Sequence, residues 1–148
     1  MVVAVVGPGD AGSDVAFSVG RLLAVRGAVV VCGGLGGVMA SASEGAASVG
    51  GTVVGLLPGL DRAEANPWVS VAIPTGLGEL RNGLVVRACD AVVAVGGGYG
   101  TLSEIAFALK AGKRVVGVGS WDIPGVEVAS SAEEAVDLVF ATPSSGRR

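Results

Sequence analysis

The sequence contains no histidine, which excludes a Ser-His-Asp triad and removes the commonest nitrogen ligand of zinc, so no metal site is expected. Basic residues form no cluster apart from Arg147-Arg148, which argues against a face that binds nucleic acid. No apolar run reaches the roughly 18–20 residues of a membrane span. The apolar N-terminus also lacks the basic region of a signal peptide. We therefore expect a cytoplasmic protein that binds neither nucleic acid nor a membrane.

Cysteine and aromatic residues are scarce as well. The two cysteines, Cys32 and Cys89, lie in apolar segments, and we expect small buried side chains rather than a disulfide. In contrast, the chain has 26 glycines and about half of its residues are apolar. This composition suits tight turns between strands and helices and close packing of helices on a sheet.

Short apolar runs alternate along the chain with longer amphipathic segments. The predicted strands are Val2–Val6, Ala28–Cys32, Thr52–Leu56, Val69–Ile73, Ala91–Val95, Arg114–Val118 and Val126–Ala129. The predicted helices are Asp14–Val25, Gly37–Val49, Gly78–Ala88, Thr101–Ala111 and Ala132–Phe140. Nearly continuous hydrophobicity indicates strands that are covered on both faces, as in a parallel sheet of βαβ units.

The predicted fold is therefore α/β, a single-domain, doubly wound (Rossmann-like) and mostly parallel sheet of about seven strands with helices on both faces. Residues 1–141 would form this nucleotide- or phosphate-binding domain, and residues 142–148 a flexible C-terminal tail. The longest interruption, Leu57–Pro67, is expected to be a mobile loop over the ligand edge.

Three glycine-rich turns follow predicted strands and should meet at the carboxyl edge of the sheet, where ligands of such folds bind. They are Gly7-Pro-Gly-Asp-Ala-Gly12, Gly33-Gly-Leu-Gly-Gly37 and Gly96-Gly-Gly-Tyr-Gly100. The first turn has the spacing of a dinucleotide fingerprint, but no acidic residue ends the second strand and Pro8 removes a backbone donor. We interpret it as a tight turn that leads into a helix capped by Ser13 or Asp14, with Gly7 among the residues expected to contact the ligand at this edge.

The second turn either permits a sharp bend or lets a ligand approach Gly33, Gly34 and Gly36 closely.

The third turn carries the strongest functional signal. An apolar strand ends at the glycines and a helix is predicted to begin at Thr101, so unpaired amides and the positive end of the helix dipole would form an anion site. The predicted phosphate ligands are Gly97, Gly98, Gly100 and Thr101. Tyr99, at the tip of the turn, would stack on a base or cover the turn.

Glu104 has two interpretations. With Thr101 it has the spacing of a capping box, in which the glutamate returns to the N–H of the capping residue. Alternatively, its carboxylate would lie beside a bound phosphate and contact a ribose.

Arg81 falls on the apolar face of the preceding helix, near its start. That face also carries Leu84, Val85 and Ala88. A buried guanidinium needs a partner, and the candidates are the ligand phosphate and Glu104. The alternative is an arginine that extends to solvent.

The motifs together resemble the "Lonely guy" (LOG) superfamily, which has been mislabelled as lysine decarboxylases. It contains cytokinin-activating nucleoside-monophosphate phosphoribohydrolases and the molybdenum-cofactor carrier proteins. The resemblance lies in Cys32–Met39, Gly50–Pro58, Arg81 and Gly96–Glu104. It implies a homodimer or homotetramer, with the interface on the helices around Arg81 and Thr101, and in the hydrolases a catalytic pair at Arg81 and Glu104.

Two departures separate the chain from the hydrolase pattern. The proline that opens the hydrolase motif is Gly96 here, and the Glu-Arg-Lys around the hydrolase arginine is Leu80-Arg81-Asn82. Both departures look more like the carrier branch. Decarboxylation is not expected, because a pyridoxal enzyme needs a lysine and Lys110 and Lys113 lie away from the glycine turns.

The primary expectation is thus a carrier that binds a phosphorylated small molecule, with a molybdopterin-type cofactor as cargo. The alternative is an enzyme that needs no cofactor and hydrolyses a nucleoside 5′-monophosphate to free base and ribose 5-phosphate. A third interpretation is a sensor whose ligand shifts the oligomeric state.

Overall fold

The computed structural model describes residues 1–142, so all but Thr142 of the predicted flexible tail lies outside the described residues. The strands are β1 (Val2–Val6), β2 (Val29–Cys32), β3 (Val53–Leu57), β4 (Val71–Pro74), β5 (Ala91–Val95), β6 (Arg114–Val118) and β7 (Val126–Ala129). They form one sheet with the order β4-β3-β2-β1-β5-β6-β7, and each neighbouring pair is parallel. The predicted α/β, doubly wound sheet is confirmed.

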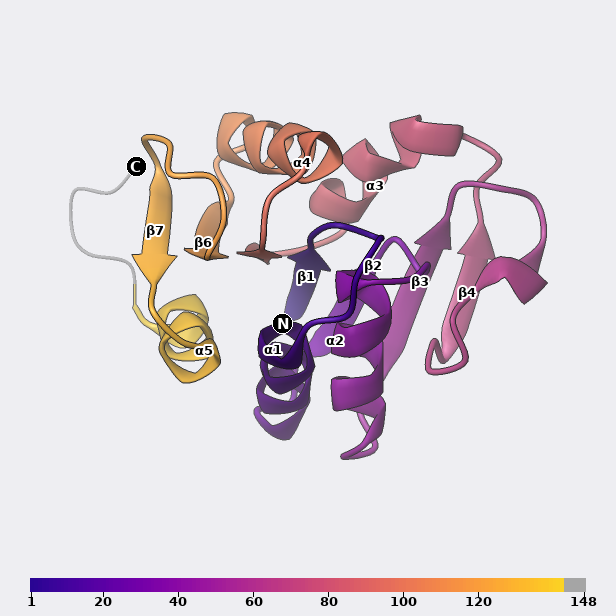
Figure 1. Ribbon diagram of the computed structural model, residues 1–148, viewed down its shortest axis with the longest axis horizontal. Coiled ribbons are helices and arrows are strands. Elements are labelled where there is room, and N and C mark those ends of the chain that lie inside the picture. The colour runs from indigo at the N-terminus through magenta and orange to yellow at the C-terminus, as the bar shows by residue number, and fades with distance from the viewer. Residues whose placement is uncertain (143–148) are drawn as a thin grey trace.

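Helices cover both faces of the sheet, as Figure 1 shows. One face carries α1 (Asp14–Val25), α2 (Val38–Ala47) and α5 (Ala132–Phe140), and the other carries α3 (Arg81–Arg87) and α4 (Tyr99–Lys110). In β1, Val3 and Val5 pack with the first group of helices, whereas Ala4 and Val6 belong to the core under α3 and α4. Burial on both sides explains why the strands are apolar at nearly every position.

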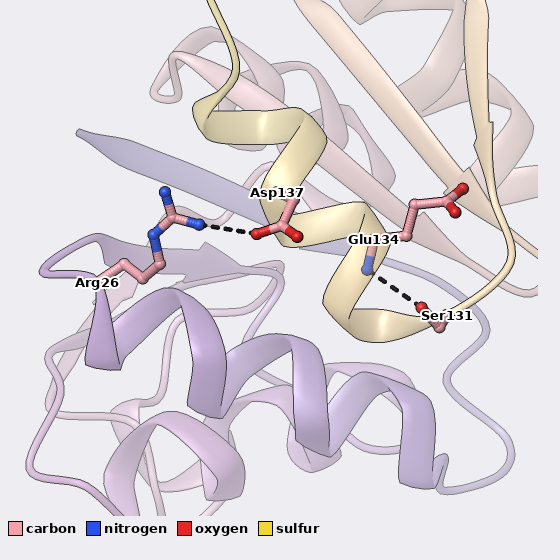
Figure 2. Close-up of polar contacts among 4 residues, drawn as sticks. All are labelled: Arg26, Ser131, Glu134 and Asp137. Atoms are coloured by element: carbon pink, nitrogen blue, oxygen red, sulfur yellow. Dashed lines mark hydrogen bonds and ion pairs between the residues drawn. The ribbon is translucent and has the colours of Figure 1, made fainter.

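Side chains cap two of the helices that pack together on the α1 face. Ser13 accepts a hydrogen bond from the N–H of Ala16 at 3.0 Å, which confirms it as the N-cap of α1. Figure 2 shows the same arrangement at α5, where Ser131 accepts from the N–H of Glu134. In that view Arg26, just after α1, reaches Asp137 of α5 at 3.1 Å.

Both cysteines are buried and free, as predicted. Burial raises the pKa of each thiol, Cys32 and Cys89 alike, so both favour the neutral form. Every helix within residues 1–142 is too short or too polar to traverse a bilayer.

The order of the strands creates a switch point between β1 and β5. From β1 the chain moves outward through β2, β3 and β4, and then returns to β5 and continues outward in the opposite direction. The loops that leave β1 and β5 therefore diverge to opposite sides of the sheet. In open α/β sheets this divergence opens a crevice beyond the carboxyl ends of the strands.

Candidate functional site

A cavity of about 190 Å³ lies at this switch point. It brings together seven of the residues that the sequence suggests for the site: Gly7, Gly33, Arg81, Gly98, Gly100, Thr101 and Glu104. These residues come from the loops after β1, β2 and β5 and from α3 and α4. Residues more than 90 positions apart in the sequence thus line the same cavity, because the carboxyl ends of parallel strands lie at the same edge of the sheet.

The other four suggested residues lie outside the cavity. Gly34 has φ +78°, and a Cβ there would meet the side chain of Leu57 at 2.7 Å. Gly36 lies next to the carbonyl of Gly9, at 3.4 Å from an added Cβ. Gly34 therefore serves the path of the turn, whereas the surroundings of Gly36 do not require a glycine.

Gly97 and Tyr99 lie on the outer side of the third turn, against Trp121. An added Cβ at Gly97 would be 3.6 Å from Nε1 of Trp121. The ring of Tyr99 stacks on that of Trp121, with 6.3 Å between the centroids, and is 86% exposed.

Backbone amides line the start of α4. The helix begins at Tyr99, and its N-cap is Gly98 in an extended conformation with no side-chain cap. Within residues 1–142, the N–H groups from Gly97 to Thr101 donate no hydrogen bond, and the first amide to do so is that of Leu102, to the carbonyl of Gly98 at 2.9 Å. Three of these amides belong to Gly98, Gly100 and Thr101, which line the cavity, and are thus available to an anion there.

The predicted helix start at Thr101 and the capping box with Glu104 are wrong. Thr101 is the third residue of α4, not its cap, and both side chains are buried at the cavity. The chain enters α4 from an extended residue, Gly98, without a side-chain cap, so the helix begins two residues earlier than the Thr-x-x-Glu spacing indicates.

Arg81 is buried, only 8% exposed, and does not extend to solvent. Its Nε donates to the carbonyl of Leu56 at 2.9 Å, Nη2 to that of Gly33 at 3.3 Å, and Nη1 to Oδ1 of Asn82. All three acceptors are neutral, and no carboxylate of the described chain lies within 4.0 Å of the guanidinium. The guanidinium therefore has no ion-pair partner among the described residues, although its charge acts on the carboxyl of Glu104 in the same cavity.

The face of α3 that carries Arg81 differs from the predicted one. Val85 is buried with it, but Leu84 and Ala88 are exposed. The predicted helix Gly78–Ala88 is divided, because Gly78–Leu80 forms a 3-10 turn and α3 begins only at Arg81. Within α3 itself, Arg81 shares its buried face with Val85 and Val86, because the apolar residues Leu84 and Ala88 lie on the side that faces outward.

Gly33 allows the guanidinium to lie against the backbone. A Cβ at this position would be 2.6 Å from Nη2 of Arg81 and 2.7 Å from Sδ of Met39. The second glycine turn thus supports the site by making room for a protein side chain.

Glu104 lines the same cavity. Burial raises the pKa of its carboxyl to about 7, and the charge of Arg81 offsets only part of this effect. Within the described residues Glu104 makes no hydrogen bond or ion pair, so it is free to accept or donate one to a ligand.

Two important residues escape sequence reasoning. Trp121, in the loop after β6, donates from Nε1 to the carbonyl of Gly98 at 3.0 Å and so fixes the third turn. Asn66 donates from its side-chain amide to the carbonyls of Gly34 and Leu35 and to the hydroxyl of Ser43. The predicted loop Leu57–Pro67 is thereby attached to the second glycine turn. The position of Trp121 just after a strand was the available signal.

Comparisons with known proteins agree with this fold. The model of the SLOG cluster4 family matches residues 1–144. An uncharacterized protein of Archaeoglobus fulgidus is 43% identical over 146 residues, which cover 96% of each chain.

Two solved structures are similar in both sequence and fold. The molybdenum cofactor binding protein of Rippkaea orientalis has 36% identity and a TM-score of 0.87, over 93% of this chain and 94% of that one. The molybdenum cofactor carrier protein of Chlamydomonas reinhardtii has 35% identity and a TM-score of 0.84, over 93% and 95% of the two chains.

Proposed function

The chain belongs to the SLOG cluster4 family, within the superfamily that its motifs indicate, and from this premise we propose that it is a carrier-like protein for a phosphorylated, molybdopterin-type ligand. The phosphate would bind in the cavity at the switch point, on the amides at the start of α4 and beside Arg81. The relatives with about 35% identity that are named for binding or carrying the molybdenum cofactor support this choice of cargo.

The observation that carries the proposal is the buried guanidinium of Arg81, which has no ion-pair partner among the described residues. A buried guanidinium that bonds only to neutral acceptors is costly unless an anion neutralises it. Of its five N–H donors three are used, so two remain for a ligand oxygen. The free amides of Gly98, Gly100 and Thr101, which line the cavity, add donors of the kind that phosphate accepts.

The conformation of Gly96 supports the carrier rather than the hydrolase branch. Its φ is +74°, whereas the ring of proline fixes φ near −65°. The third turn therefore follows a backbone path that a Pro-Gly-Gly motif cannot adopt. A hydrolase that depends on that motif would hold its substrate differently.

A second candidate, the phosphoribohydrolase, is favoured by Glu104. A buried carboxyl that faces the cavity without a protein partner could orient ribose hydroxyls and stabilise an oxocarbenium-like sugar. Arg81 would then hold the phosphate and help neutralise developing charge.

One calorimetric experiment tests phosphate binding. Ribose 5-phosphate is titrated into the wild-type protein, Arg81→Gln and Arg87→Gln, the last being a control on the same helix at an exposed position. Removing a charge-assisted interaction should weaken binding by about 10- to 150-fold in Arg81→Gln and leave the control unchanged. A wild-type protein that produces no heat refutes the proposal. Mass spectrometry of a co-purified pterin would identify the cargo.

Incubation with AMP and GMP separates the two candidates. Release of free base and ribose 5-phosphate that disappears in Glu104→Gln establishes the hydrolase. Binding without release supports the carrier.

A further inference from the structure

A second hollow continues outward from the phosphate cavity. This outer groove has a volume of about 360 Å³ and is lined by Glu79, Leu80, Asn82, Tyr99, Gly100, Ser103 and Phe107. Asn82 and Gly100 also line the inner cavity, so the two hollows meet at these residues. An added Cβ at Gly100 would be 3.7 Å from Nδ2 of Asn82, which shows how closely they approach at the junction.

The volumes indicate that a ligand extends from one hollow into the other. Sites for small molecules and cofactors typically measure about 300–1,000 Å³. The inner cavity, at about 190 Å³, is below this range, whereas the outer groove is within it. A phosphate ester held at Arg81 must therefore place the rest of its structure outside the inner cavity, and the outer groove is the adjoining space.

The outer groove offers an apolar and aromatic surface at unusual exposure. Leu80 is 78% exposed, Phe107 53% and Tyr99 86%. The side chain of Tyr99 is held in position, because its ring stacks on Trp121, and Trp121 in turn donates a hydrogen bond to the carbonyl of Gly98. An exposed aromatic ring that is already held by such contacts loses little conformational entropy when a flat ligand stacks on it.

Polar groups occur at defined places in the same groove. Oδ1 of Asn82 accepts from Arg81, while its Nδ2 donates no hydrogen bond within residues 1–142 and is available at the junction. Glu79 supplies the single carboxylate among the lining residues and would accept from N–H groups. Leu80 and Asn82 are also the two positions at which the chain departs from the hydrolase motif around Arg81.

We propose that the outer groove binds the flat heteroaromatic ring of the ligand whose phosphate occupies the inner cavity, with Tyr99 as the stacking surface. This inference rests on the proposed phosphate site. It specifies the ligand class as a phosphate ester of a planar ring with N–H groups at its edge. Leu80 and Phe107 form the apolar wall, and Glu79 and Asn82 contact the polar edge of the ring.

The test compares two probes that differ by the ring. Ribose 5-phosphate carries the phosphate on a sugar without a base. Guanosine 5′-monophosphate adds a planar ring with N–H groups. Calorimetry of the wild-type protein should show tighter binding of the nucleotide. In Tyr99→Ala, the affinity for the nucleotide should fall by about 5- to 150-fold, the usual effect of removing an aromatic side chain beneath a base. The affinity for ribose 5-phosphate should not change.

The controls keep the two proposals separable. Tyr99→Phe should retain the tighter binding, and Val25→Ala, an exposed position at the end of α1, should behave as wild type. Tyr99 is so exposed that its replacement should leave the melting temperature unchanged. If ribose 5-phosphate binds but the nucleotide binds no more tightly, the ring site is refuted and the phosphate site survives. If neither probe binds, both are refuted.

A second copy of the chain is the competing occupant of the groove. Sedimentation of Tyr99→Ala against the wild type detects it. A loss of self-association with unchanged affinity for the nucleotide would overturn the proposal, whereas an unchanged oligomeric state with weaker nucleotide binding supports it.

Discussion

Replacing Glu104 by glutamine isolates the effect of one buried carboxyl on stability. In the folded protein, burial raises its pKa from the usual value of 4.5 to about 7. Between these two values the folded state keeps a proton that the unfolded state has released. Rising pH therefore favours unfolding in this window, and the loss is complete once pH exceeds about 7. Glutamine does not titrate and removes this dependence.

The magnitude follows from the difference between the two pKa values. At about 1.4 kcal/mol for each tenfold change in proton affinity, the cost at pH 8 is at most about 3 kcal/mol. Urea unfolding in buffers without phosphate should show Glu104→Gln and wild type to be similar at pH 5. At pH 8 the variant should be more stable by up to that amount.

The control for this experiment is Glu44→Gln, an exposed position on α2 that should follow the wild-type pH profile. If the difference in unfolding free energy between Glu104→Gln and wild type is the same at pH 5 and pH 8, the carboxyl is not held in a desolvating environment. The account of the cavity would then be incorrect.

Four further substitutions, one of them a control, test the residues that hold the site in place. Gly33→Ala places a Cβ 2.6 Å from Nη2 of Arg81, so calorimetry should show weaker binding of ribose 5-phosphate, whereas Gly83→Ala, with open space around it inside α3, should raise the melting temperature through a gain of about 0.5–1 kcal/mol. Asn66→Ala removes the amide whose Nδ2 is shared among the acceptors on Gly34, Leu35 and Ser43, together with the bond its Oδ1 accepts from the N–H of Trp68, and chemical denaturation should show a loss of about 1–3 kcal/mol; an unchanged midpoint would contradict a structural role for this loop. Gly96→Ala forces a side chain into φ +74° and should cost about 1–2 kcal/mol in the same assay, and no loss would mean that the turn has another conformation.

Much of the fold follows from local pattern. The strands are rich in valine at consecutive positions. Because both of their faces are buried, apolar and polar residues do not alternate along them, and this continuous pattern distinguishes them from strands with one exposed face. Val2–Val6 and Ala91–Val95 were therefore predicted with their observed bounds, and their adjacency follows from the doubly wound topology. The meeting of Gly7, Gly33 and Gly98 at one edge follows in turn from parallel strands.

The details of the site depend on geometry that spacing does not reveal. The start of α4 is set by the backbone of Gly98, and the capping box was the better match to sequence alone. Leu84 and Ala88 are apolar but exposed, so apolar spacing alone assigned the wrong face of α3 to the interior beside Arg81. Trp121 reaches its partner Gly98 across 23 positions, so no local motif could pair them.

The hydrogen bonds of Arg81 to the main chain of Leu56 and Gly33 have a kinetic consequence. The long side chain is already immobilised before an anion binds. The conformational entropy of its rotamers is therefore lost during folding and not on binding. The association rate at such a rigid site would be governed by diffusion and long-range electrostatic attraction. Substitutions that change the affinity would then act mainly on the dissociation rate.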